Sequence, residues 1–210
     1  YSFPLVKHLP AHIETFQEFI DSYRLYALDK ETQKVYNLAQ GTEYYPVPEL
    51  LVFDVQNDKV ERGRIYSEEQ PDATAFVTFY AQNDTLYTLN SHFVWAKYVP
   101  KRVNDSLFYQ QIASADVAPE PNRSYREVYY QDIEYEIVQC YTTAKCMYFL
   151  VQKKDTNEFQ VMTLDTKTGK IEGKIPLNPL LDNPKKLEHH TQDIATGATD
   201  NFVFQLKTEK

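Results

Sequence analysis

The residue types most often used in catalysis are present in this sequence, but they form no complete catalytic motif. No Cys or His lies at metal-ligand spacing from the adjacent pair His189 and His190. None of the seven serines stands in a Gly-x-Ser-x-Gly elbow, and neither cysteine belongs to a Cys-x-x-Cys motif. The five glycines form no phosphate-binding loop. The sequence therefore predicts neither a metal site nor a cofactor.

One run of acidic residues has a spacing that suits a hydrolase. Asp132, Glu134 and Glu136 alternate with apolar or aromatic residues, so on a strand all three carboxylates lie on one face. A pair of facing carboxylates is the central requirement of glycoside hydrolysis, which makes Glu134 and Glu136 candidate acids. An exposed polar face of a sheet has the same pattern, and we favour that interpretation. A non-enzymatic protein is thus preferred to a carboxylate-dependent hydrolase.

Aromatic residues are unusually common, with 17 Tyr and 12 Phe, and several are candidates for binding. Tyr44 and Tyr45 precede a Pro-x-Pro segment, which makes a rigid and extended aromatic stretch. Tyr129 and Tyr130 form a second pair, and Trp95 is the only tryptophan. Tyr and Trp combine an apolar ring with a polar tip, which suits a binding surface. These five residues are the candidate ligand- or partner-binding residues, and packing under loops is the alternative for the tyrosine pairs.

The two cysteines flank a segment of five residues. If this segment is a hairpin loop, Cys140 and Cys146 face each other across the two strands and are close enough for a disulfide. The clean alternation before Cys140 and the wholly apolar run after Cys146 indicate two distinct strands. The pattern leaves two alternatives open, namely a disulfide and two buried thiols.

Three glycosylation sequons begin at Asn83, Asn104 and Asn122, and each lies in a predicted turn or loop. The chain begins at Tyr1 without a Met or a signal-like apolar run, which fits a mature protein or a trimmed one equally. Together with the possible disulfide, these features predict an extracytoplasmic glycoprotein, secreted or periplasmic.

A hairpin pattern recurs three times, at Asp29, Asp54 and Asp165. Each copy reads apolar–Asp–x–x–[Thr/Asn]–x–Lys–[Val/Ile] and has an apolar strand on each side. The Asp carboxylate can accept hydrogen bonds from backbone amides further along the turn, and Gln, Asp or Gly follows where the chain reverses. Further hairpins fill the rest of the chain, so the sequence predicts about fourteen strands. Helical spacing occurs only over residues 12–23 and 184–194.

The recurring turn resembles the outer-strand hairpin of pyrroloquinoline-quinone-like and related β-propellers, in which a strand, an Asp-x-x-Thr-Gly turn and a strand repeat once per blade. The resemblance covers about ten residues in each copy. It implies an all-β, antiparallel, hairpin-built domain, with a small or partial β-propeller favoured. Because the copies are unevenly spaced, a closed lipocalin-like barrel and a β-sandwich remain alternatives. No linker rich in Gly, Ser or Pro interrupts residues 1–210, which predicts a single domain.

The net charge of −8 and the pI of about 5.2 disfavour nucleic acid and anionic membrane surfaces as partners. No apolar run is long enough to span a membrane. The favoured function is a secreted or periplasmic binding module that presents loops on a β scaffold to a protein partner. A β-barrel carrier of an apolar small molecule, such as a lipid or pigment, is the alternative, and a hydrolase is less favoured.

Overall fold

The computed structural model describes residues 24–39, 49–66, 76–120, 134–156, 158–177, 194–198 and 203–207 of the 210-residue chain. All its regular elements are β-strands, as predicted. Among these residues no helix is long and apolar enough to cross a membrane. The predicted helices lie outside them, apart from Ile194, which is the first residue of a strand.

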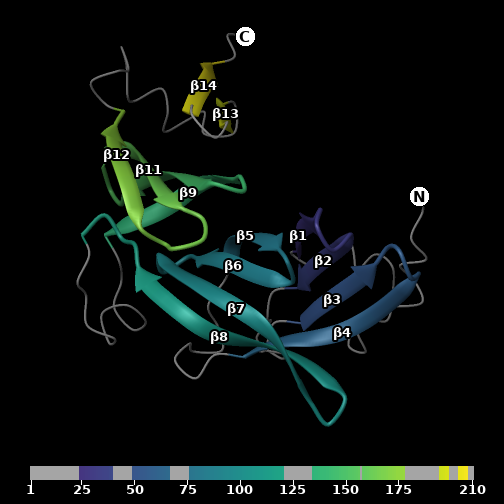
Figure 1. The fold of residues 1–210 in the computed structure, drawn as a ribbon. Helices are drawn as coiled ribbons and strands as arrows, with labels where there is room; N and C mark the ends of the chain where they lie inside the picture. The colour runs from purple at the N-terminus through teal and green to yellow at the C-terminus, as the bar shows by residue number, and fades with distance from the viewer. Residues whose placement is uncertain are drawn as a thin grey trace. The chain divides into compact units, whose positions relative to one another are not determined.

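Fourteen strands form three sheets within the described residues (Figure 1). The eight-stranded sheet contains β1 (Arg24–Asp29), β2 (Lys34–Ala39), β3 (Glu49–Asp54), β4 (Lys59–Tyr66), β5 (Phe76–Gln82), β6 (Thr85–Asn90), β7 (Val94–Val103) and β8 (Ser106–Asp116). The four-stranded sheet contains β9 (Tyr135–Thr142), β10 (Cys146–Lys153), β11 (Phe159–Asp165) and β12 (Ile171–Pro176). The third sheet pairs β13 (Ile194–Ala198) with β14 (Val203–Lys207).

Most strands pair with the next strand along the chain, as expected for a fold assembled from hairpins. β1 to β4 form one antiparallel series, and β9 to β12 form another. The strand order of the large sheet, β1-β2-β3-β4-β8-β7-β6-β5, joins two groups of four through a parallel pairing of β4 with β8. The all-β, hairpin-built prediction is therefore confirmed. A propeller blade is likewise built of four strands. Here, however, the parallel pairing of β4 with β8 joins two groups of four into one sheet.

The chain divides into two compact units. Unit 1 comprises Tyr1–Ala75, Ala81–Leu86 and Tyr98–Ile112, and unit 2 comprises Phe76–Tyr80, Tyr87–Lys97 and Ala113–Lys210. In unit 1 the most deeply buried side chains include Tyr36, Leu38, Leu50 and Tyr109. These residues come from β2, β3 and β8, and their burial fixes the register of these strands. The single-domain assignment stays a prediction.

Trp95 lies in the core of unit 2 and is only 2% exposed. It packs in a cluster with Phe93, Met147 and other buried apolar residues, and its indole N–H donates to the Thr166 carbonyl at 3.0 Å. Gly169 lies against the ring, where an added Cβ would come within 2.4 Å of ring atoms. Trp95 therefore supports the fold of unit 2 instead of presenting a surface to a partner.

The predicted disulfide is not formed, because Cys140 and Cys146 are both free thiols. β9 and β10 do form the expected hairpin, but Phe149 is the residue opposite Cys140. Cys146 lies three positions before Phe149 on β10, and side chains alternate along a strand. The two thiols therefore point to opposite faces of the sheet and cannot meet. Burial raises the pKa of the Cys140 thiol to about 12, which favours its protonated form at neutral pH.

Candidate binding site

The three predicted Asp turns are present, and each Asp carboxylate binds the backbone of its own turn. Asp29 Oδ1 accepts hydrogen bonds from the amides of Glu31 and Thr32, at 3.1 and 3.3 Å. The carboxylates of Asp54 and Asp165 accept equivalent amide bonds three residues on, at 3.0 and 2.8 Å. These bonds satisfy amides that the chain reversal leaves unpaired, which explains the recurrence of Asp at this position.

The fifth position of each turn adopts left-handed backbone geometry. The φ angles are 55° at Gln33, 50° at Asp58 and 68° at Gly169. The position of the recurring Lys follows from the strand pairing. In the first two copies it lies directly across from the Asp, because Asp29 pairs with Lys34 and Asp54 pairs with Lys59. Opposite charges directly across an antiparallel pair are favourable.

These hairpins line up side by side in unit 1, which places four charged residues in one row across four strands. Lys34 is the register partner of both Asp29 and Asp54, and Asp54 is in turn the partner of Lys59. The row therefore alternates in sign from β1 to β4. Hydrogen bonds from Asn57 hold the pKa of Asp54 below its usual value, so this carboxylate is ionised near neutral pH.

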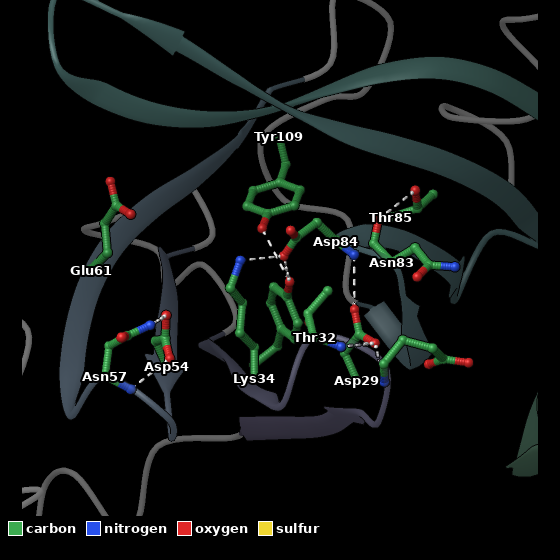
Figure 2. A network of polar contacts seen from close by, with 12 residues as sticks. Asp29, Thr32, Lys34, Asp54, Asn57, Glu61, Asn83, Asp84, Thr85 and Tyr109 are labelled. Carbon is green, nitrogen blue, oxygen red and sulfur yellow. Dashed lines mark hydrogen bonds and ion pairs between the residues drawn. The ribbon is translucent and has the colours of Figure 1, made fainter.

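Asp84, in the turn between β5 and β6, connects this row to the buried tyrosines of unit 1 (Figure 2). Its backbone amide donates to Asp29 Oδ2 at 2.8 Å. Its Oδ1 accepts hydrogen bonds from Lys34 Nζ at 2.7 Å and from the Tyr36 hydroxyl at 2.6 Å. Tyr109 completes the network by donating its hydroxyl to that of Tyr36 at 3.5 Å. The network thus joins residues of three hairpins, β1–β2, β5–β6 and β7–β8.

The protonation states of the network follow from its burial. Burial acts to raise the pKa of Asp29, but hydrogen bonds from the backbone of Asp84 and from Thr32 outweigh it and hold the pKa below its usual value. Burial raises the pKa of Tyr36 and of Tyr109, so both phenols stay neutral. The network therefore combines two neutral phenols with the carboxylate of Asp29, whose charged form is held by hydrogen bonds.

A first hollow of about 490 Å³ opens above this network. Its lining combines four cations and three carboxylates with an apolar and aromatic floor; it consists of Lys34, Val52, Asp54, Lys59, Glu61, Asp84, Pro100, Lys101, Arg102, Leu107 and Tyr109. Arg102 binds both carboxylate oxygens of Glu61, at 2.5 and 2.6 Å. Lys59, Lys101 and Arg102 are exposed, so the rim of the hollow is accessible to a large partner.

A second hollow of about 370 Å³ adjoins the first, since Glu61 and Leu107 line both. Its other lining residues lie at the start of β3, in the middle of β4 and at the β7–β8 turn, and they include Arg62, Arg64 and Asp105. In the described part of the chain, no group of three or more His, Cys, Asp or Glu residues is arranged to hold a metal ion. The arrangement is suited to binding a charged partner through side chains and backbone.

Two predicted sequons lie on exposed hairpin turns. Asn83 and Asp84 form the two-residue turn between β5 and β6, with φ of 51° and 58°. Asn104 and Asp105 form the turn between β7 and β8, with φ of 48° and 64°. Both positions of a type I′ turn require positive φ, which Asn and Asp tolerate best after Gly. The Asn-Asp pairs thus have a structural cause of their own, and glycosylation at these sites stays a prediction.

The structure describes only part of the remaining predicted site residues. Tyr44, Tyr45, Tyr129, Tyr130 and Asn122 lie outside the described residues. Glu134 and Glu136 are exposed, and Glu134 forms an ion pair with Lys153 at 3.5 Å.

Sequence reasoning missed Asp84, Lys101 and Arg102, because their role depends on which hairpins become neighbours. The short-range signal that was available, an Asn-Asp turn, identified only the local geometry of Asp84.

Comparison with known proteins gives little further information. No family model and no curated protein matches the chain. A quinoprotein alcohol dehydrogenase-like protein from Bacteroides thetaiotaomicron is similar in structure, with a TM-score of 0.42 and 12% identity over 72% of this chain and 32% of that one. The β-propeller domain of Swd1 from Myceliophteria thermophila gives a TM-score of 0.40 and 9% identity over 80% of this chain and 47% of that one. The chain spans less than half the length of either protein, and at these TM-scores neither bears on its function.

Proposed function

We propose that this chain is a non-enzymatic binding module that holds a protein partner on the β scaffold of unit 1. The observation that carries the proposal is the first hollow, an open site with an apolar floor and a charged rim at Lys59, Lys101 and Arg102. Protein–protein interfaces combine a buried apolar centre with a polar, accessible rim in the same way. The buried network of Asp29, Asp84 and Tyr36 supports the site because it holds the floor in place before a partner arrives.

The lining of the two hollows argues against the alternative of an apolar carrier. Sites for apolar small molecules are enclosed and mostly apolar, with few polar groups. Both of the larger hollows described here carry several ionised side chains, and Lys59 and Lys101 are exposed to solvent. A hydrolase is also poorly supported, since Glu134 is paired with Lys153 and both Glu134 and Glu136 are exposed on unit 2.

An extracytoplasmic location is part of the proposal. It is supported by the exposed turn positions of Asn83 and Asn104, which a glycosylating enzyme could reach. The free thiols of Cys140 and Cys146 give it no support. Intact-mass measurement of material from the producing organism tests the location. Glycan mass at Asn83 or Asn104 is expected if the organism glycosylates Asn, and an unmodified mass with two free thiols in a glycosylating organism would contradict it.

Native mass spectrometry of the chain, isolated gently from the producing organism, tests the binding function. We expect a retained protein adduct that falls at least tenfold in the double variant Lys101→Glu/Arg102→Glu. The control is Lys154→Glu/Lys167→Glu, which changes the net charge equally at exposed lysines of unit 2 and should leave the adduct unchanged. A bound apolar small molecule instead of a protein, or equal loss in both variants, would overturn the proposal. Thermal melting of each variant confirms that it is folded.

A further inference from the structure

The strand β6 is buried on both of its faces. Tyr87 and Leu89 lie on one face and belong to the core of unit 2. Side chains alternate along a strand, so Thr88 and Asn90 lie on the opposite face. Both of these residues are polar, and both are 0% exposed. A buried polar group is costly unless it is hydrogen-bonded, so the partners of these two side chains matter for the stability of unit 2.

The carbonyl oxygen of the Asn90 side chain is bonded within the turn that follows β6. This atom, Oδ1, accepts hydrogen bonds from the amides of His92 and Val94, at 3.0 and 2.9 Å. A backbone amide can only donate, so the atom that both amides bind must be the oxygen of the side chain. The Asn90 amide therefore cannot be turned over, and its Nδ2 is held as a donor inside the protein.

Two polar atoms on this face have no partner. In the described part of the chain, neither the Thr88 hydroxyl nor Asn90 Nδ2 forms a hydrogen bond with a protein atom, and both are shielded from solvent. The two residues are two positions apart on one strand, so their Cα atoms are about 6.6 Å apart. A small molecule that lies about 2.9 Å from each polar atom can bridge this separation. Leaving both groups unpaired would cost the full penalty for their removal from water.

The chemistry of the two groups restricts what can bridge them. Asn90 Nδ2 only donates hydrogen bonds, whereas the Thr88 hydroxyl can donate or accept. A cation would meet the donor hydrogens of Asn90, and an anion would lose its hydration beside two groups that carry no charge. A neutral molecule that both accepts and donates fits the pair. Water is the smallest such molecule, and buried waters in proteins bond to buried polar groups of this kind.

From these observations we propose that one internal water molecule bridges Asn90 Nδ2 and the Thr88 hydroxyl and is an integral part of the β6–β7 turn. The water accepts a hydrogen bond from Nδ2 and donates one to Thr88 Oγ1. It thereby fixes the plane of the Asn90 amide and keeps Oδ1 on the two amides of the turn. That turn holds Phe93 at a φ of 61° and leads directly to Trp95, and both side chains lie in the core of unit 2.

NMR spectroscopy of the folded chain tests the proposal directly. In rotating-frame NOE spectra, where exchange peaks have the opposite sign, we expect a cross peak between water and the side-chain amide protons of Asn90. The exposed amide of Asn57, which donates Nδ2 to Asp54 at 2.8 Å, is the control and should show no long-lived water. The Asn90 cross peak should be lost in Thr88→Val, because the hydroxyl that holds the water is removed. Absence of the cross peak in the wild-type chain would overturn the proposal.

The stability of Thr88→Val gives an independent test, because the sign of the change differs between a bridged and an empty site. With the water in place, the variant loses a hydrogen bond and leaves Asn90 Nδ2 unpaired, so its urea midpoint should fall by about 0.5 M. At an empty site, valine would remove an unpaired hydroxyl at nearly the same volume and raise the midpoint. Thr85→Val makes the same change at the more accessible start of β6 and should shift the midpoint less than half as far. An unchanged or raised midpoint in Thr88→Val would contradict the bridging water.

Discussion

The turns at Asp29 and Asp165 share one sequence pattern but are tied to their units by different residues. Asp29 is fully buried, and its second oxygen accepts the amide of Asp84, 55 residues away. The Asp165 carboxylate accepts hydrogen bonds from Lys167 and Thr168 of its own turn, and the next residue, Thr166, supplies long-range contacts. Thr166 donates its amide to the Lys145 carbonyl at 2.9 Å and accepts the indole N–H of Trp95.

This difference shows which part of the motif is local. The bond from the Asp carboxylate to the amide three residues on occurs in every copy, so it belongs to the turn itself. The attachment to the rest of the unit is made by the carboxylate in one copy and by the following residue in the other. The same substitution should consequently have unequal effects in the two turns.

The largest difference is expected at the fifth turn position, which is Gln33 in the first copy and Gly169 in the third. Gly169→Gln should destabilise the protein by about 3 to 4 kcal/mol, because the new side chain must occupy left-handed geometry and its Cβ meets the ring of Trp95. Urea denaturation measures the loss. In a Trp95→Ala background the same exchange should have a smaller effect, and an undiminished effect there would show that contact with the ring is not the cause.

The next largest difference in stability between the two turns is expected when the Asp side chain is removed. Asp29→Ala loses two turn hydrogen bonds and leaves the Asp84 amide without its acceptor in a partly buried site, so we expect a loss of about 2 to 3 kcal/mol. Asp165→Ala loses bonds at a more exposed turn and should have an effect of about 1 kcal/mol. Urea midpoints of the two variants, measured side by side, test the ranking. Equal losses would mean that the bond to Asp84 contributes nothing.

Local patterns were sufficient to predict the turns but not their long-range partners. The positions of Asp54 and Asp165 follow from hydrogen bonds within a few residues, and a single sequence contains that information. The bond between Asp29 and Asp84 and the parallel pairing of β4 with β8 depend on which hairpins meet in space. The thiols of Cys140 and Cys146 fall on opposite faces because the turn takes fewer residues than the loop between them. A change of one residue in register reverses the face of a side chain, which sequence patterns do not specify.

The same limit applies to the candidate site. Lys34, Asp54 and Lys59 were identified as turn residues, yet their alignment in one row requires the register of three strands. Lys101 and Arg102 carried no recognisable signal, since the β7–β8 hairpin reaches Glu61 only through the junction of β4 with β8.

Acid should weaken the first turn through Asp29. The folded protein holds the pKa of this carboxyl below its usual value, so its stabilising contribution is complete above the unfolded pKa of about 3.9. The contribution is lost as the pH falls through the lower pKa of the folded state. Asp29→Asn lacks this titration, so the free energies of unfolding of wild type and variant should converge as the pH is lowered from 5 towards 2. Urea titrations over this range measure the convergence, and a constant difference would contradict the assignment.

The smallest effect is expected for the reverse exchange at the fifth position, Gln33→Gly. Glycine adopts the φ of 55° at Gln33 without a steric penalty, which favours the variant. The variant also loses the hydrogen bond from Gln33 Nε2 to the Lys30 carbonyl, and glycine has more freedom in the unfolded chain. These contributions oppose one another at an exposed site, so stability should change by less than about 0.5 kcal/mol. A loss comparable with that of Gly169→Gln would mean that the Gln33 side chain contributes far more than its one hydrogen bond to the Lys30 carbonyl explains.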